Sequence, residues 1–280
     1  TFVLVRVGLA ALVLHAVVLA TGRRYPREPG VLTRYGFMGL FHNILPGALI
    51  VYATARIGAG AASILNATAP IFALLIAHVA TADEKITRAK LAGILLGAAG
   101  VAAMAGPQAF SGLTGDTVAV VAMLLATFCY GLSAVIGRSF GGIDPTVSAT
   151  CQLSASTLML LPFALLVDHP WSMAAPGPAA LFSALALALV STALAYVIFF
   201  QLIARAGGAN AILVTLIIPV GGVLLAWLVL GEVLTPGEAA GMLLIALGLI
   251  VIDGRALGRL ASLRPASGPD ALAREPARPD

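Results

Sequence analysis

Two stretches of the chain follow one pattern, RIGAGAASILNATAP at residues 56–70 and RAGGANAILVTLIIP at residues 205–219. Each stretch opens with an arginine, passes through glycine and alanine, and closes on a proline. The two arginines are 149 residues apart, and so are the two prolines. This internal repeat indicates that two related units make up most of the chain.

The likeness continues beyond these stretches. Three further pairs lie 148 residues apart: Glu84 and Glu232, Gly93 and Gly241, and Gly100 and Gly248. We expect a first unit over residues 1–106 and a second unit over residues 116–253. Residues 254–280 are rich in Arg, Pro, Ala and Ser, which predicts a disordered tail.

The composition places both units in a membrane. Hydrophobic residues make up 60% of the 280 residues, charged residues only 10%, and the mean hydropathy is +1.03. A soluble domain carries about 25% charged residues because its surface faces water, so lipid must be the solvent of this chain. The net charge of +4 therefore indicates basic loops of a membrane protein, and we expect no nucleic-acid partner.

Nine apolar runs can cross a bilayer, which takes about 20 residues of helix. They cover residues 2–20, 35–55, 61–80, 91–105, 117–137, 146–167, 179–203, 209–230 and 239–252. None of them alternates strictly between apolar and polar residues, which favours helices over barrel strands. The sequence thus predicts an all-α polytopic membrane protein, with charge-poor linkers at 107–115 and 169–178.

The two predicted units differ in their number of spans. The second unit holds five runs and the first holds four. An odd number of spans per unit places consecutive units in opposite orientations, as in many secondary transporters. We therefore expect an inverted repeat of two five-helix units, with the first helix of the first unit encoded before Thr1.

Several motifs recur in a fixed order. Segments 61–100 and 209–248 each combine a Gly/Ala-rich entry, a proline, a Glu–x–Ile/Leu–Thr turn and a glycine-rich last helix. The stretch YGLSAVIGR at residues 130–138 adds an aromatic–Gly opening, and Arg6 adds an arginine early in a helix. The chain resembles the EamA type of the drug/metabolite transporter (DMT) superfamily. The resemblance implies ten helices in the intact protein and export or exchange of small metabolites.

Polar side chains within the spans are the candidate binding groups, because they are costly to bury in lipid. Asn66 and Thr215 lie four residues before Pro70 and Pro219, and a proline inside a helix kinks it and frees the carbonyl four residues earlier. The predicted solute-binding site consists of Asn66, Thr215, His42, Asn43, Tyr130, Gln152 and Tyr196. Packing between helices is the alternative interpretation for each of them.

Other residues have more ordinary interpretations. Glu84 and Glu232 are interpreted as caps or loop partners, and Cys129 and Cys151 as small buried hydrophobic residues. Arg6 is the only full charge well inside a predicted span. It either extends to the membrane surface or holds an anionic group of the solute. The GxxxG patterns at 93–97 and 237–241 predict close helix packing.

Transport is the leading functional hypothesis. No acidic residue lies in the middle of a predicted span, and the sequence holds no HExxH motif, catalytic dyad or phosphate loop. We therefore predict no catalytic residue, metal or cofactor. The hypothesis is a secondary transporter that exports a small solute (an amino acid, a nucleoside or a drug-like molecule) across the inner membrane. A membrane-embedded enzyme and a non-transporting membrane subunit are the alternatives, and the oligomeric state stays open.

The basic residues predict the orientation. If all nine runs are spans, 14 of the 16 Lys and Arg residues fall on one side, and Arg6 and Arg56 fall on the other. Basic loops stay in the cytoplasm, so the C-terminal tail is predicted to be cytoplasmic.

This orientation can be tested with single cysteines in a background that lacks Cys129 and Cys151. Lys85→Cys should react with a membrane-impermeant maleimide only after the cells are permeabilised, whereas Thr114→Cys should react in intact cells. Labelling of Lys85→Cys from outside would overturn the predicted inverted repeat.

Overall fold

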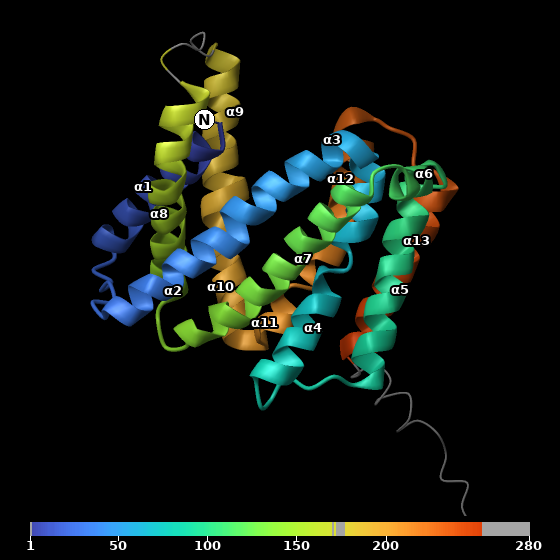
Figure 1. Ribbon diagram of the computed structural model, residues 1–280, viewed down its shortest axis with the longest axis horizontal. Helices are drawn as coiled ribbons and strands as arrows, with labels where there is room; N and C mark the ends of the chain where they lie inside the picture. Colours follow the sequence, from blue (N-terminus) through green and yellow to red (C-terminus); the bar gives the residue numbers. More distant parts are fainter. Residues whose placement is uncertain (1, 170, 172–176, 254–280) are drawn as a thin grey trace, which may run out of the picture.

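Helices account for every regular element that the structure, a computed structural model, describes (Figure 1). The described residues are 2–169, 171 and 177–253. The predicted tail 254–280 and most of the predicted linker 169–178 lie outside them. Large apolar side chains such as Val79, Leu166 and Phe182 point outward with more than 70% of their surface exposed, as lipid-facing side chains should.

The first half of the chain forms seven elements, of which the one marked η1 is a π-helical turn. They are α1 (Phe2–Ala20), α2 (Pro29–Gly39), η1 (Leu40–Ile44), α3 (Leu45–Asn66), α4 (Ala69–Ala80), α5 (Arg88–Ala105) and α6 (Gln108–Gly115).

The second half forms a similar series of helices with more π-helical turns, and η2 is a 3₁₀ turn. The elements are α7 (Thr117–Gly137), η2 (Arg138–Phe140), α8 (Pro145–Phe163), η3 (Ala164–Asp168), α9 (Pro178–Ala188), η5 (Leu189–Leu194), α10 (Ala195–Ala206), α11 (Gly208–Ala211), α12 (Val214–Leu225), η6 (Ala226–Leu230) and α13 (Pro236–Asp253).

A polytopic membrane fold is confirmed. Eight helices of the described part are long and apolar enough to cross a membrane, and the shorter α4 is also apolar. The observed helix boundaries in this region differ from the predicted runs 35–55 and 61–80. Helix continues from Pro29 to Asn66 with one non-helical residue, Gly58. After Asn66 a turn at residues 67–68 precedes α4.

The two prolines of the repeat have different roles. Pro219 lies inside α12, as predicted for a kink. Pro70 lies in the first turn of α4, so its prediction as a kink within a helix is wrong. A proline is tolerated in the first turn because the N–H group it lacks would have no partner there. Pro70 therefore starts a new helix where the sequence suggested a bent one.

Glycines at equivalent places of the repeat break the helices in the same way. Gly58 has φ 79° and ψ 160°, and Gly207, 149 residues later, has φ 86° and ψ 164°. Side chains other than glycine rarely adopt this backbone conformation. The likeness supports two related units, and their inverted orientation stays a prediction.

Helices α5 and α13 pack against each other through glycine, as the GxxxG patterns predicted. A Cβ atom added to Gly93 would lie 2.5 Å from the Gly248 carbonyl oxygen, and one added to Gly100 would lie 2.6 Å from that of Gly241. Increasing numbers in one helix meet decreasing numbers in the other, so the two helices are antiparallel. Gly93 thus faces Gly248, the repeat counterpart of Gly100. Gly100 in turn faces Gly241, the repeat counterpart of Gly93.

The predicted linker 107–115 is instead helical. Residues Gln108–Gly115 form α6, which packs on α3. A Cβ atom added to Gly60 would lie 3.0 Å from that of Ala109, and one added to Gly112 would lie 2.2 Å from the Ile57 carbonyl oxygen. Glycine in both helices permits this close approach.

The helices form two groups around a central region (Figure 1). Helices α1, α8 and α9 stand side by side at one edge, and α5 and α13 stand at the other. Helices α3 and α7 cross between the two edges and contact each other extensively. This arrangement brings parts of η1, α3, α7, α10 and α12 to the middle of the molecule.

The glycine contact between α5 and α13 predicts a sharp difference between two substitutions. Gly100→Ala places a methyl group against the backbone of α13 and should destabilise the protein by about 1–3 kcal/mol. Gly47→Ala adds the same group where nothing lies within 4 Å and should leave stability unchanged or slightly raised. Thermal melting in detergent measures both. Equal melting temperatures would contradict the described contact.

Candidate functional site

A cavity of about 630 Å³ lies where these central segments meet. Its wall is formed mainly by apolar side chains of α3, α7, α10 and α12. Five of the seven predicted site residues line it: His42, Asn66, Tyr130, Tyr196 and Thr215. Pro219 also lines the cavity, and Thr54 and Ser63 add further hydroxyl groups. A largely apolar wall with a few polar groups is typical of small-molecule sites.

Aromatic side chains cluster around His42 on the cavity wall. The His42 ring meets Tyr130 and Tyr196 edge-on, at centroid distances of 5.4 and 5.5 Å, and lies 4.9 Å from the Phe199 ring. Its Nδ1 atom is 2.8 Å from the Ser133 hydroxyl. His42 belongs to the π-helical turn before Pro46. A π-turn bulges one residue out of the helix, and such turns are frequent at functional sites.

Asn43 does not line the cavity but holds a residue that does. The Tyr196 hydroxyl donates a hydrogen bond to Asn43 Oδ1, and Asn43 Nδ2 donates to the Ser156 hydroxyl at 2.6 Å. This chain connects η1, α8 and α10. The prediction that Asn43 lines the cavity is therefore wrong in this conformation, because its amide is occupied by these partners.

Gln152 lies outside the cavity as well. Its side chain is fully buried on α8, and neither amide atom has a hydrogen-bond partner among the described residues. The sequence indicated that Gln152 is polar and within a span, but it could not indicate which neighbour its helix face would meet.

The two main predicted residues, Asn66 and Thr215, lie at helix breaks on the cavity wall. Asn66 ends α3, and its Oδ1 atom is buried without a hydrogen-bond partner. Thr215 is the second residue of α12, and its hydroxyl donates to the Ile212 carbonyl oxygen at 2.9 Å. Asn66 therefore offers a free polar atom to a ligand, whereas the hydroxyl proton of Thr215 is already engaged.

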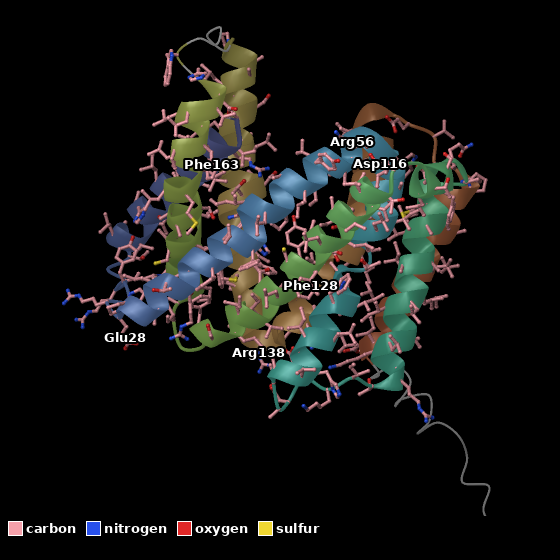
Figure 2. The ribbon with its side chains drawn as sticks, in the orientation of Figure 1. Glu28, Arg56, Asp116, Phe128, Arg138 and Phe163 are labelled. Carbon is pink, nitrogen blue, oxygen red and sulfur yellow. The ribbon has the colours of Figure 1, made fainter. Side chains whose placement is uncertain are left out.

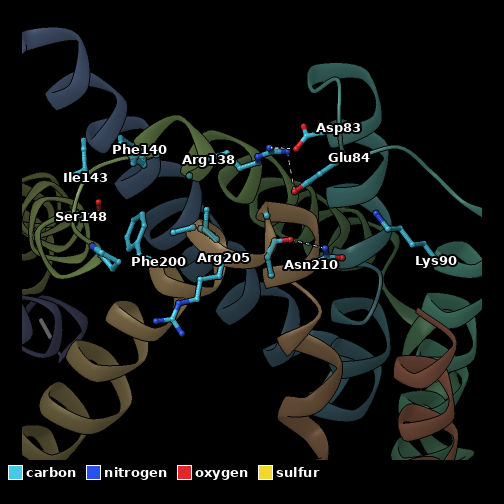
Figure 3. Close-up of a pocket in the computed structure, with 17 residues that line it drawn as sticks. Asp83, Glu84, Lys90, Arg138, Phe140, Ile143, Ser148, Phe200, Arg205 and Asn210 are labelled. Atoms are coloured by element: carbon cyan, nitrogen blue, oxygen red, sulfur yellow. Dashed lines mark hydrogen bonds and ion pairs between the residues drawn. The ribbon is translucent and has the colours of Figure 1, made fainter. Parts of the chain in front are cut away.

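A cluster of charged groups joins three elements at one end of the molecule (Figure 3). Arg138, the first residue of η2 directly after α7, contacts Asp83 at 2.6 Å and Glu84 at 3.2 Å. Glu84 Oε2 also accepts a hydrogen bond from the Ala209 N–H at 3.1 Å. We call these groups the Glu84 cluster. A second cavity of about 480 Å³ lies beside it, with Lys90 and Arg205 on its wall.

The Glu84 cluster requires glycine at position 207. Glu84 is only 5% exposed, and a Cβ atom added to Gly207 would lie 1.8 Å from its Oε1. The interpretation of Glu84 as a loop partner is confirmed. Its counterpart Glu232 is exposed. The Arg138 hydrogen bond lowers the pKa of Asp83, so this carboxylate stays charged at neutral pH.

The opposite end of the molecule has a looser contact. Figure 2 shows Arg56 and Asp116 together there, far from Arg138. The Arg56 Nε–Asp116 Oδ2 distance is 3.5 Å, and the Arg56 guanidinium stacks over the Tyr52 ring. Thr54 and Ala59 flank Arg56 in sequence and line the main cavity. The cavity therefore extends toward the Arg56 end.

Within the described residues, no group of three His, Cys, Asp or Glu side chains could hold a metal ion. Cys129 is buried and Cys151 is half-buried, and both are free thiols. The absence of any cofactor stays a prediction from sequence.

Comparison with known proteins identifies the family. The model of the EamA-like transporter family matches residues 1–106 and 117–253. The chain belongs to this family. The resemblance to the DMT superfamily is thereby confirmed, and the protein is a multi-pass membrane transporter of small solutes rather than an enzyme.

Several relatives of this EamA-like transporter have been curated. A "probable terminal-alkyne amino-acid exporter" of Streptantibioticus cattleyicolor is 28% identical over 213 residues, covering 75% of this chain and 69% of that protein. An uncharacterized transporter of Bacillus subtilis is 23% identical, with 88% and 84% coverage. An uncharacterized Pseudomonas aeruginosa protein is 31% identical, with 88% and 83% coverage.

A solved crystal structure shares the fold. It superposes with a TM-score of 0.74 at 18% identity and covers 92% of this chain and 88% of its own.

The Glu84 cluster predicts a difference between two equivalent glutamates. Glu84→Ala leaves Arg138 and the Ala209 N–H without this partner and should destabilise the protein by about 1–3 kcal/mol. Glu232→Ala removes an exposed side chain and should change stability by less than about 0.5 kcal/mol. Thermal melting in detergent compares them. A larger loss for Glu232→Ala would show that the cluster does not hold these helices together.

Proposed function

We propose that this transporter exports a small organic solute across the inner membrane by alternating access to the main cavity. The observation that carries the site assignment is the buried Oδ1 atom of Asn66, which has no hydrogen-bond partner and belongs to a residue that lines the cavity. A buried polar atom without a hydrogen bond costs free energy. A solute that donates to this atom recovers part of that cost.

The Arg138 end of the molecule is more tightly held together than the Arg56 end, and this difference supports alternating access. The Glu84 cluster ties α7 and α11 to the end of α4 at the Arg138 end, and the cavity extends toward the Arg56 end. In the proposed cycle this is the state open to the outside. Breaking the Glu84 cluster opens the other side.

The repeat supports the same cycle. Inverted units can exchange conformations, so that one end closes as the other opens. The reciprocal glycine contacts of α5 and α13, and the equal breaks at Gly58 and Gly207, are what such a relation would produce.

The distribution of charge supports the orientation. Arg138, Lys85 and Arg205 belong to the basic side counted from the sequence, which by the positive-inside rule is cytoplasmic. We place the C-terminus there too. The direction of transport is proposed from the relative named as an amino-acid exporter, and a small amino acid or a molecule of similar size is the proposed solute class.

Two substitutions test the site. Asn66→Leu keeps the volume and removes the polar atom, so it should lower solute flux about tenfold or more, the worth of one or two hydrogen bonds. Thr215→Val should lower flux less, because its hydroxyl already bonds to the Ile212 carbonyl. Efflux of radiolabelled amino acids from loaded vesicles that contain the full-length protein measures both.

Thr114→Val is the matched control, since Thr114 is exposed on α6 and bonds only to the Ser111 carbonyl among the described residues. It should transport like wild type. If Asn66→Leu also transports like wild type, or fails to fold, Asn66 is a packing residue and the site assignment is wrong.

A further inference from the structure

The main cavity and the second cavity are lined by the same two helices. On α7, Tyr130 lines the main cavity and Gly137 lines the second one. On α10, Tyr196 lines the main cavity and Ile203 lines the second one. The two residues on each helix are seven positions apart, which is about 10 Å along the axis of a helix. The second cavity therefore lies beyond the main cavity along α7 and α10, toward the Arg138 end.

Contacts at both levels hold these helices side by side. At the main cavity, a tyrosine of α7 and a tyrosine of α10 both meet the His42 ring. At the level of the second cavity, a Cβ atom added to Gly137 would lie 2.7 Å from Ile203 Cδ1 and 3.6 Å from Met38 Cε. Met38 precedes His42 by four residues in the helix that runs through α2 and η1. The same three segments thus meet at both levels.

The side chains around Gly137 are apolar and closely packed. Met38 is fully buried, Ile203 is 5% exposed and Phe200 is 3% exposed. The Phe200 ring meets the Phe140 ring edge-on at a centroid distance of 6.1 Å. No described residue lines both cavities. A layer of apolar side chains closes a passage by excluding water, so this layer keeps the two cavities apart.

The Glu84 cluster holds the two helix ends that form this layer. Arg138 directly follows Gly137 and contacts the Glu84 carboxylate at 3.2 Å. On the other side, the Gly207 N–H donates to the Ile203 carbonyl oxygen at 3.0 Å, and Gly207 packs against the Glu84 carboxylate. One carboxylate therefore holds the ends of α7 and α10 next to each other, and its loss loosens both sides of the layer.

The second cavity reaches the protein surface at the Arg138 end (Figure 3). Asp83 and Arg205 line it, and both side chains are exposed. Ile143 and Phe200 add apolar surface to its wall. Charged groups in contact with water beside apolar side chains suit a small organic solute that leaves the water at this point.

We propose that the second cavity is the cytoplasmic section of the transport path, and that Ile203 and Met38, packed around Gly137, form the barrier between it and the main cavity. The proposal rests on the proposed function and adds a second site to it. In this site a small solute with an apolar body binds before it enters the main cavity. When the Glu84 cluster breaks, the ends of α7 and α10 separate, Ile203 leaves Gly137, and the solute moves on.

Single cysteines test the two sections of the path in the full-length protein without Cys129 and Cys151. Ala204 lines the second cavity, and Ser63 lines the main cavity. In inside-out membrane vesicles, a membrane-impermeant methanethiosulfonate should modify Ala204→Cys readily. It should modify Ser63→Cys about tenfold more slowly or less, because only a minor state exposes the main cavity to that side. Equal rates, or modification of Ala204→Cys only in right-side-out vesicles, would overturn the proposal.

Substitutions at the barrier then test its assignment with Ser63→Cys as the reporter. Ile203→Ala removes buried carbon atoms from the barrier and should raise the modification rate from the cytoplasmic side about tenfold or more. Leu194→Ala is the matched control. It removes as many carbon atoms from a side chain that is 53% exposed, and it should leave the rate unchanged.

Ile203→Val removes a single methyl group and should give a smaller rise of the same sign. If Ile203→Ala does not fold, Ile203→Val decides. An unchanged rate in whichever of the two variants folds would place the barrier elsewhere and overturn the proposal.

Blocking the second cavity tests whether solute passes through it. A bulky maleimide attached to Ala204→Cys should abolish the efflux of radiolabelled amino acids from vesicles. The same label on Thr33→Cys should leave efflux unchanged, since Thr33 is exposed on α2 and lines neither cavity. Normal efflux from fully labelled Ala204→Cys would show that the solute takes another path.

The two kinds of measurement separate this proposal from the proposed function. A modification rate that rises in Ile203→Ala, without efflux of any amino acid, would refute transport of these solutes and retain the connection between the two cavities. Efflux that persists in labelled Ala204→Cys, with an unchanged modification rate in Ile203→Ala, would retain transport and refute this path.

Discussion

Lipid offers no hydrogen bonds to the backbone, and this constraint determines where the helices of the transporter can break. Broken helix is tolerated at membrane depth only where it is buried in protein or lines a cavity. The turns at residues 67–68 and 212–213 both adjoin the main cavity through Asn66 and Thr215. At each break a threonine hydroxyl donates to the carbonyl oxygen three residues earlier, from Thr68 within the first turn to Leu65 and from Thr215 just after the second turn to Ile212. The helix breaks are therefore tolerated because they adjoin the cavity, and residues at the breaks in turn form part of the cavity wall.

The same constraint explains what the sequence could predict. Spans in lipid need long apolar runs, so the run 117–137 corresponds to α7 and the run 239–252 falls within α13. The repeat drew attention to the segments around Gly58 and Gly207, where the backbone does break. Apolar composition cannot show a turn between two apolar helices, so the break before α4 was missed. Apolar composition also gave no sign that residues 108–115 form a helix against α3.

Prediction of the candidate site was limited by side-chain direction. Hydrophobicity identifies a polar residue within a span, and Asn66, Tyr130 and Tyr196 do line the cavity. Which face of a helix meets a cavity depends on the neighbours that it packs against, and this information is spread over several helices. Asn43 and Gln152 illustrate the limit, since one holds Tyr196 and the other is buried on α8.

The unequal surroundings of Glu84 and Glu232 have a kinetic consequence. In the proposed cycle, a protein without solute spends most of its time in whichever state its internal contacts favour, and the Glu84 cluster favours the state closed at the Arg138 end. Only the minor population can then accept a solute from that side, and the apparent affinity there falls by the fraction of molecules in the competent state. A single buried carboxylate could in this way make the apparent affinities on the two sides of the membrane differ, although both sides use the same cavity.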